Sequence, residues 1–269
     1  YRAYVGGTSG LIYGYVNDGF YTVADFESFD SKSRTWKLKD GVVDSSPLSD
    51  TPRPGNAKFK KLTAIDPNST NPYQLTEADR TVIGNTTPKF SGGFGLNATY
   101  KGFDMSMFFN FMYDFDVLNA NKIMLTTWAD NKENNFLMDI ASDKRWRNFD
   151  DMGNEIRYSP EVLAEFNKNA TMWNPTSIGR PICMSYAVED GSFLRLNSAT
   201  LGYTLPSVWT KKVGLSKVRF YVSGNNLFTL TGYSGYDPEV NIATGLTPNI
   251  DYNRYPRSRT YTFGAQLTF

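Results

Sequence analysis

The sequence predicts an all-β fold of about five or six antiparallel strands, forming part of a large transmembrane β-barrel. Aromatic residues make up 15% of the 269 residues, although the mean hydropathy is only -0.43. Apolar and polar residues alternate with period two in several segments, which is typical of strands. The connections between these segments are alternately very short and very long, as in an outer-membrane barrel.

Composition excludes several other classes of protein. The 28 basic and 27 acidic residues give a net charge of +1, so the chain lacks the basic footprint of a nucleic-acid binder. There is no histidine, which removes the usual zinc sites and the histidine-activated nucleophiles of many enzymes. The one cysteine, Cys183, leaves no internal disulfide to form. We therefore expect no catalytic site and no enzyme activity.

The clearest strand lies at the end of the sequence, in residues 259–269. Its polar face carries Thr and Gln side chains, and its apolar face meets lipid in the barrel interpretation. The last residue would then sit in the aromatic girdle. The side chains predicted to face lipid and to serve barrel assembly are Tyr261, Phe263, Leu267 and Phe269.

The same alternation predicts four strands upstream. Residues 93–100 and 103–113 form a hairpin around the polar turn Lys101-Gly102. Two further strands are predicted at 190–205 and 217–228.

The remaining segments, 18–90, 119–188 and 229–258, are predicted as irregular connections. Structureless loops beyond about 15 residues are uncommon in compact soluble domains, which counts against a soluble sandwich. If Phe269 is periplasmic, all three connections are extracellular. Five strands cannot close a barrel by themselves, so we expect residues 1–269 to be the C-terminal portion of one barrel domain.

One segment has the spacing of a calcium loop. Asp66, Asn68 and Thr70 occupy its first, third and fifth places, Glu77 its twelfth, and Asp79 follows. Two prolines and the small number of carboxylates favour an Asx-rich turn instead. Calcium is the only cofactor that the sequence suggests.

The long connection 119–188 carries three tryptophans and two nearby arginines. Trp and Arg are the typical anchors of binding surfaces, but Trp residues in a long loop also form the loop's own core. Both interpretations stay open. The candidate ligand- or partner-binding residues are Trp128, Arg145, Trp146 and Trp173.

Short motifs spread over nearly the whole chain resemble the SusC/RagA-type TonB-dependent outer-membrane transporters, and they occur in the family's order. The motifs are 10–21 (GLIYGYVNDGFY), 79–85 (DRTVIGN), 100–104 (YKGFD), 188–196 (VEDGSFLRL), 201–206 (LGYTLP), 222–228 (VSGNNLF), 234–239 (SGYDPE) and 255–257 (YPR).

This resemblance implies a 22-stranded barrel filled by an N-terminal plug that is not in this sequence. The family's Asp-x-Asn-Gly-Asp-Gly loop is replaced here by residues 66–76, and residues 119–187 match no family motif. The implied function is TonB-driven import of oligosaccharides or oligopeptides across the outer membrane, with a SusD-type surface lipoprotein as partner. The family also implies that barrel assembly recognises a final strand ending in an aromatic residue, as Phe269 does.

Two alternatives remain. One is a soluble, secreted all-β module that binds glycans, and the other is a passive porin-like or adhesive barrel.

Overall fold

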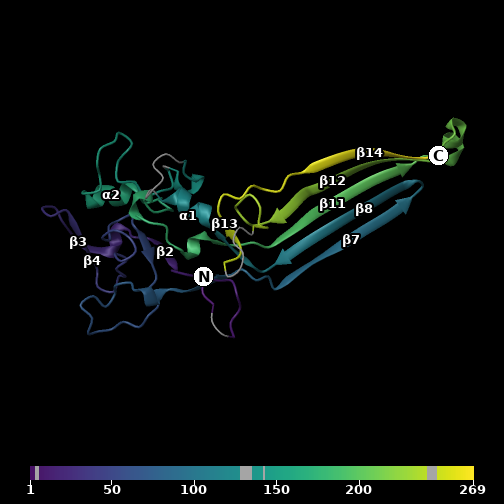
Figure 1. Cartoon of the computed structure of the whole chain (residues 1–269). Coiled ribbons are helices and arrows are strands. Elements are labelled where there is room, and N and C mark those ends of the chain that lie inside the picture. Colours follow the sequence, from purple (N-terminus) through teal and green to yellow (C-terminus); the bar gives the residue numbers. More distant parts are fainter. Residues whose placement is uncertain (4–5, 128–134, 142, 241–246) are drawn as a thin grey trace. The chain divides into compact units, whose positions relative to one another are not determined.

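A computed structural model describes residues 1–3, 6–127, 135–141, 143–240 and 247–269. The chain forms two compact units, and each is composed of two segments (Figure 1). Unit 1 comprises Tyr1–Gly84 and Leu118–Val188, and unit 2 comprises Asn85–Val117 and Glu189–Phe269. Among these described residues, no helix has both the length and the apolar character needed to cross a membrane.

Unit 2 contains a five-stranded antiparallel sheet in the order β14-β12-β11-β8-β7. The five strands are those that the alternation predicted, and the all-β fold class is confirmed. The fourth runs three residues further than expected. Their bounds are β7 (Phe90–Tyr100), β8 (Phe103–Tyr113), β11 (Phe193–Thr204), β12 (Lys217–Thr231) and β14 (Thr260–Thr268).

The register gives this sheet one apolar and one polar face. One row across the strands pairs Ala98, Met105, Leu201, Val222 and Phe263. The next row, whose side chains point to the other face, pairs Asn97, Ser106, Thr200, Ser223 and Thr262. Five strands therefore contribute to a continuous apolar surface.

Aromatic side chains occupy the apolar face at both ends of the strands. At one end the Phe90 and Tyr113 rings stack 6.4 Å apart. At the other end Phe103 lies 4.5 Å from Tyr203, and Tyr100 is exposed beside them. Two aromatic bands that flank an apolar zone are typical of an outer-membrane barrel.

The strands at the second end are joined by short connections. The β7–β8 turn consists of Lys101 and Gly102, both with positive φ (46° and 88°), as a two-residue hairpin turn requires. This confirms the predicted hairpin. The β11–β12 connection holds α3 (Ser207–Thr210) and the 3-10 helix η6 (Lys211–Val213).

The polar face carries an ion pair across β11. Arg219 Nε on β12 donates to Asp104 Oδ1 on β8 at 2.9 Å. Gly202 lies between them on β11, and a Cβ there would come within 2.4 Å of the Arg219 guanidinium. Glycine at this position leaves room for the pair.

A small sheet has the strand order β10-β9-β13, with β9 (Asp116–Asn119), β10 (Val188–Asp190) and β13 (Ile250–Asp251). The segment after β12 is tied to β11 by a buried ion pair, in which Arg195 Nη2 donates to Asp237 Oδ1 at 2.5 Å.

The expectation that residues 18–90 and 119–188 are irregular is wrong, because unit 1 contains short strands and helices in both segments. Its short elements are β1 (Leu11–Gly14), β2 (Asn17–Phe20), β3 (Phe26–Asp30), β4 (Thr35–Leu38), β5 (Ala57–Phe59), β6 (Thr81–Asn85), α1 (Ala120–Thr126) and α2 (Pro160–Phe166), with 3-10 helices η1 (Val23–Asp25), η2 (Glu77–Asp79), η3 (Met138–Ile140), η4 (Pro175–Ser177) and η5 (Ser185–Ala187). Strands of three to five residues are too short to show a clear alternation.

Both segments of unit 1 supply one hydrophobic core. Tyr15 and Phe59 from the first segment pack with Trp173, Ile178 and Met184 from the second. The unit is therefore held together by contacts between residues more than one hundred positions apart.

Candidate functional site

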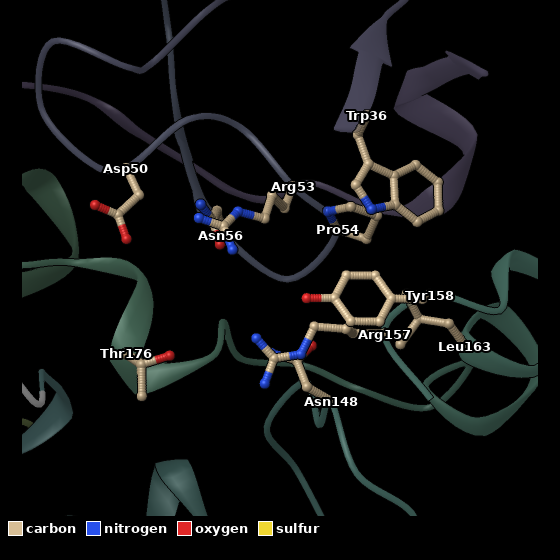
Figure 2. Close-up of a pocket in the computed structure, with 10 residues that line it drawn as sticks. All are labelled: Trp36, Asp50, Arg53, Pro54, Asn56, Asn148, Arg157, Tyr158, Leu163 and Thr176. Atoms are coloured by element: carbon tan, nitrogen blue, oxygen red, sulfur yellow. The ribbon is translucent and has the colours of Figure 1, made fainter. Parts of the chain in front are cut away.

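A small polar cavity lies within unit 1 (Figure 2). It has a volume of about 60 Å³, and both segments of the unit contribute to its walls. Figure 2 shows the Tyr158 hydroxyl and the Arg157 guanidinium directed into the space across from Arg53 and Asn56. The remaining lining residues are Trp36, Asp50, Pro54, Asn148, Leu163 and Thr176.

One wall of the cavity is aromatic and is fixed by the β3–β4 hairpin. Phe29 pairs with Trp36 across the hairpin, and their rings lie 4.8 Å apart. Phe29 also stacks on Tyr158 at 6.1 Å. The Arg34 guanidinium lies 4.7 Å from the centre of the Tyr158 ring. Tyr158 is therefore held between two neighbours while its hydroxyl reaches the cavity.

Arg157 is positioned by charge and by aromatic contacts. It forms an ion pair with Glu155, and its guanidinium lies 5.4 Å from the centre of the Phe149 ring and 5.7 Å from that of Tyr158. Arginine held in this way presents several hydrogen-bond donors at a fixed place. Together with Asn56, Asn148 and Thr176, it gives the cavity both donors and acceptors.

A second, wider hollow of about 370 Å³ shares Asn148, Arg157 and Thr176 with the cavity. Residues 145–150 line it, with Asn174 and Pro175. Aromatic surface beside convergent amide, hydroxyl and guanidinium groups suits a polar ligand such as a sugar or a peptide.

The candidate binding residues have different positions. Arg145 lines the second hollow, and its Nη1 donates to the Ile140 carbonyl at 3.4 Å. Trp146 borders the same hollow, yet it is only 2% exposed. Trp173 is fully buried in the core, edge-on to Tyr186 at 4.8 Å. Trp128 lies outside the described residues.

Trp146 packs in the hydrophobic core next to the site. Its ring packs with Phe20 at 5.7 Å and with Ile156 and Leu163. Gly55, with φ +89°, lies so close that a Cβ there would fall 2.1 Å from Trp146 Cδ1. For Trp146 and Trp173, the geometry is that of the loop's own core, the second of the two interpretations left open by the sequence.

The sequence did not single out Trp36, Arg53, Arg157 or Tyr158. None of them belongs to a motif, and they come together only when the two segments of unit 1 fold against each other. A weak signal was present in the neighbouring Arg157 and Tyr158, an adjacent cationic and aromatic pair.

The suggested cation loop contains a hydrogen-bonded carboxylate. Asp79 Oδ1 accepts from Thr63 N at 2.8 Å and Thr63 Oγ1 at 2.7 Å, and Oδ2 accepts from Thr76 N at 2.8 Å. Burial acts to raise the pKa of Asp79, but these hydrogen bonds hold it well below the usual value.

The other candidate ligands are also engaged. Asp66 Oδ1 accepts from Asn68 N at 2.9 Å, closing an Asx turn, and Glu77 pairs with Arg80. Within the described ranges, no three Asp, Glu, Cys or His residues are grouped so that they could hold a metal ion. Cation binding by Asp66, Asn68, Thr70, Glu77 and Asp79 stays a prediction, and this geometry does not favour it.

The four residues predicted to face lipid and to serve assembly lie at the edge of the sheet. Tyr261, Phe263 and Leu267 on β14 are all exposed. Phe269 follows the strand and is 90% exposed.

Comparisons with known proteins cover nearly the whole chain. It is 33% identical over 266 residues to TonB-dependent receptor P3 of Formosa agariphila, a match to 97% of this chain and 22% of that protein. It is 38% identical over 88 residues to TonB-dependent receptor SusC of Bacteroides thetaiotaomicron, covering 31% of this chain and 8% of SusC. No protein-family model matches. The chain spans about a fifth of the length of the first of these relatives.

Solved structures share the fold. The RagAB peptide transporter aligns with 98% of this chain and 23% of its own, with a TM-score of 0.57 and 22% identity. The RagAB peptide importer in the open-open state aligns with 96% of this chain and 22% of its own, with a TM-score of 0.54 and 22% identity.

Proposed function

Because this chain belongs to the SusC/RagA-type family of TonB-dependent transporters, we propose that it forms part of an outer-membrane importer of oligosaccharides or oligopeptides. In this proposal the five-stranded sheet of unit 2 is part of the barrel wall, and unit 1 is extracellular and contributes to cargo binding. The relatives named above are receptors and transporters, which supports a role in transport rather than catalysis.

The observation that carries the membrane part of this proposal is the one-sided sheet. Phe263 is 81% exposed, and Phe220 on the neighbouring strand is 51% exposed, on the same face. Exposed apolar patches of this extent are unusual on soluble proteins and mark a surface that meets lipid or another protein. The aromatic bands at both ends of the strands favour lipid. A soluble glycan-binding module would place these side chains in water.

Cargo binding is assigned to the polar cavity and the hollow beside it. Trp36 and Tyr158 offer aromatic surface, and Arg53, Asn56 and Arg157 offer hydrogen bonds. Of the residues that the sequence suggested, we assign cargo contact to Arg145, which lines the second hollow. We assign support of the walls to Trp146 and Trp173. In the working cycle, a SusD-type lipoprotein closes over the cargo, and TonB drives its release inward through a plug.

A charge placed on either face of β14 tests the wall. Phe263→Arg should destabilise the assembled barrel by about 2–4 kcal/mol if the site lies near the bilayer midplane. Thr262→Arg, its neighbour on the polar face, should cost much less. Heat-modifiable gel migration of the outer-membrane fraction measures the folded barrel. Equal losses for both variants would contradict the assigned faces.

Uptake by whole cells tests the cargo site. Arg157→Gln and Tyr158→Ala should reduce uptake of the transported oligosaccharide or oligopeptide at least tenfold, since each removes contacts worth more than about 1.4 kcal/mol. Lys168→Gln is the matched control, because Lys168 is an exposed cation on the same segment, outside both linings.

Dependence on energy separates active from passive import. Dissipating the proton gradient should abolish uptake by the unaltered transporter. Uptake that survives this treatment would favour a porin-like barrel.

If uptake is unchanged in both Arg157→Gln and Tyr158→Ala, the cargo binds to another part of the protein.

A further inference from the structure

The connection between β11 and β12 presents apolar side chains to solvent beyond the end of the sheet. Val208 and Val213 are 69% and 71% exposed, and Trp209 is 60% exposed. Thr210, on the same helix α3, is buried, and its hydroxyl donates to the Ser207 carbonyl at 3.3 Å. The connection is thus fixed by the buried side chain of Thr210, whereas the side chains of Val208, Trp209 and Val213 are exposed.

This connection is also strongly basic. Residues 205–217 include Lys211, Lys212 and Lys217 and no acidic residue, whereas the whole chain is nearly balanced, with 28 basic and 27 acidic residues. Lysines beside Trp and Val are typical of segments that lie in the headgroup region of a membrane.

The connection lies at the end of the sheet, between two neighbouring strand ends. Thr204 N donates to the Gly102 carbonyl at 2.8 Å, so the connection begins next to the β7–β8 turn. At its other end, Ser216 N donates to the Thr268 carbonyl at 2.8 Å, beside the end of β14. Lys101 lies in that neighbouring turn, with Nζ 5.2 Å from the centre of the exposed Tyr100 ring. Aromatic and lysine side chains therefore alternate along this end of the sheet.

We propose that residues 205–217 form an interfacial anchor that docks into the headgroup layer of anionic phospholipid at the short-turn end of the barrel. Val208, Trp209 and Val213 enter the boundary between headgroups and acyl chains. Lys211 and Lys212 lie against the lipid phosphates. The inference rests on the proposed membrane location and does not depend on the cargo.

Two observations select phospholipid as the occupant. The connection joins β11 to β12 at the end of the sheet where Tyr100 and Phe103 are exposed, and in the proposed barrel the apolar face of that sheet meets acyl chains. Its charge is complementary to anionic headgroups, and each lysine near such a surface strengthens binding about fivefold.

Depth-dependent quenching tests the apolar part of the anchor. The full-length transporter, with Cys183→Ser and no other cysteine, is labelled with a fluorophore at Val208→Cys and reconstituted with lipids brominated near the headgroup or deep in the chain. We expect Val208→Cys to be quenched more by shallow bromines, and Phe263→Cys, near the middle of β14, more by deep ones. Thr262→Cys, on the polar face, should be quenched by neither.

The outcomes separate the anchor from the proposed wall. An unquenched label at Val208 with a quenched label at Phe263 would overturn the anchor alone. Loss of quenching at both positions would overturn the membrane wall together with the anchor.

Lipid selectivity tests the lysines. In discs of mixed phosphatidylglycerol and phosphatidylcholine at low salt, Lys211→Gln/Lys212→Gln should weaken retention of phosphatidylglycerol by up to about 25-fold. Lys32→Gln/Lys39→Gln, two exposed lysines of unit 1, is the control and should leave retention unchanged. Unchanged retention in the first variant overturns the headgroup contact. Displacement of the lipid by inorganic phosphate would identify a site for free phosphate and overturn the anchor.

Discussion

Replacing Gly55 by alanine should disturb the support beneath the candidate cargo site through two separate costs. Gly55 has φ +89°, and an alanine forced into the left-handed region costs about 1–2 kcal/mol. The added Cβ would also lie 2.1 Å from Trp146 Cδ1, so the buried indole must move. Overpacking of this kind costs roughly 1–3 kcal/mol. The two costs together predict that Gly55→Ala destabilises unit 1 by roughly 2–5 kcal/mol.

Hydrogen exchange followed by mass spectrometry measures this locally. The relevant amides are those of Gly55, which donates to the Tyr21 carbonyl at 2.7 Å, and Asn174, which donates to the Gly55 carbonyl at 2.8 Å. Their protection should fall about 30- to 4,000-fold in Gly55→Ala.

Gly41→Ala is the matched control for the backbone cost. Gly41 also has a left-handed backbone, φ +85°, but has nothing within 4 Å of a built Cβ. Gly41→Ala should therefore carry only the backbone cost of about 1–2 kcal/mol. In a double-mutant cycle, Gly55→Ala should cost less in the Trp146→Leu background than in the unaltered protein, because the smaller side chain leaves room for the methyl group. If Gly55→Ala and Gly41→Ala lower protection equally, the packing of Trp146 on Gly55 is not what constrains this position.

Three further predictions concern buried charge and the final strand. Arg195→Met leaves Asp237 buried without its partner and should lower the stability of the fold by about 3–5 kcal/mol. Thermal unfolding should show most of this stability restored in Arg195→Met/Asp237→Leu. If it is not restored, the loss does not come from the unpaired Asp237. The lowered pKa of Asp79 stabilises unit 1 above the unfolded pKa of about 3.9, and this contribution is lost as pH falls through the folded pKa. In hydrogen-exchange experiments, Asp79→Asn should therefore lower the protection of unit 1 at pH 7 by about 1–3 kcal/mol and make that protection less dependent on acid. An unchanged pH profile would contradict this. Deleting Phe269 should sharply reduce folded barrel on heat-modifiable gels while leaving export intact, and wild-type levels would argue against a role of this residue in assembly.

The strands of the sheet were predictable because their physical constraint is local. In β14 the alternation of Tyr261, Phe263 and Leu267 with polar residues reflects the apolar and the polar face of the sheet, and period two is visible in ten residues. The turn at Lys101 and Gly102 is equally local, since it depends on the positive φ of two neighbouring residues.

Unit 1 could not be predicted in the same way, because its constraints join distant residues. The short strand β5 gains its stability from the shared core, in which Phe59 packs with Trp173 and Met184. The candidate site has the same origin. Trp36 and Tyr158 share a wall only through Phe29, a contact that no spacing in the sequence indicates. Of the tryptophans that the sequence singled out in the long connection, Trp146 and Trp173 are buried in hydrophobic cores of unit 1.

The division of unit 1 into two segments has a consequence for the order of folding. Residues 85–117, which include the β7–β8 hairpin, separate those segments in the chain, and the hairpin brings its own two ends together, with Phe90 opposite Tyr113. Closing a loop costs entropy that grows with its length, so a formed hairpin shortens the effective loop between the two halves of the core. Phe59 cannot meet Trp173 until synthesis has passed residue 173. Insertion of the hairpin into the sheet should therefore precede completion of unit 1 and accelerate it. Variants that delay pairing of β7 with β8 should then also slow formation of the candidate cargo site.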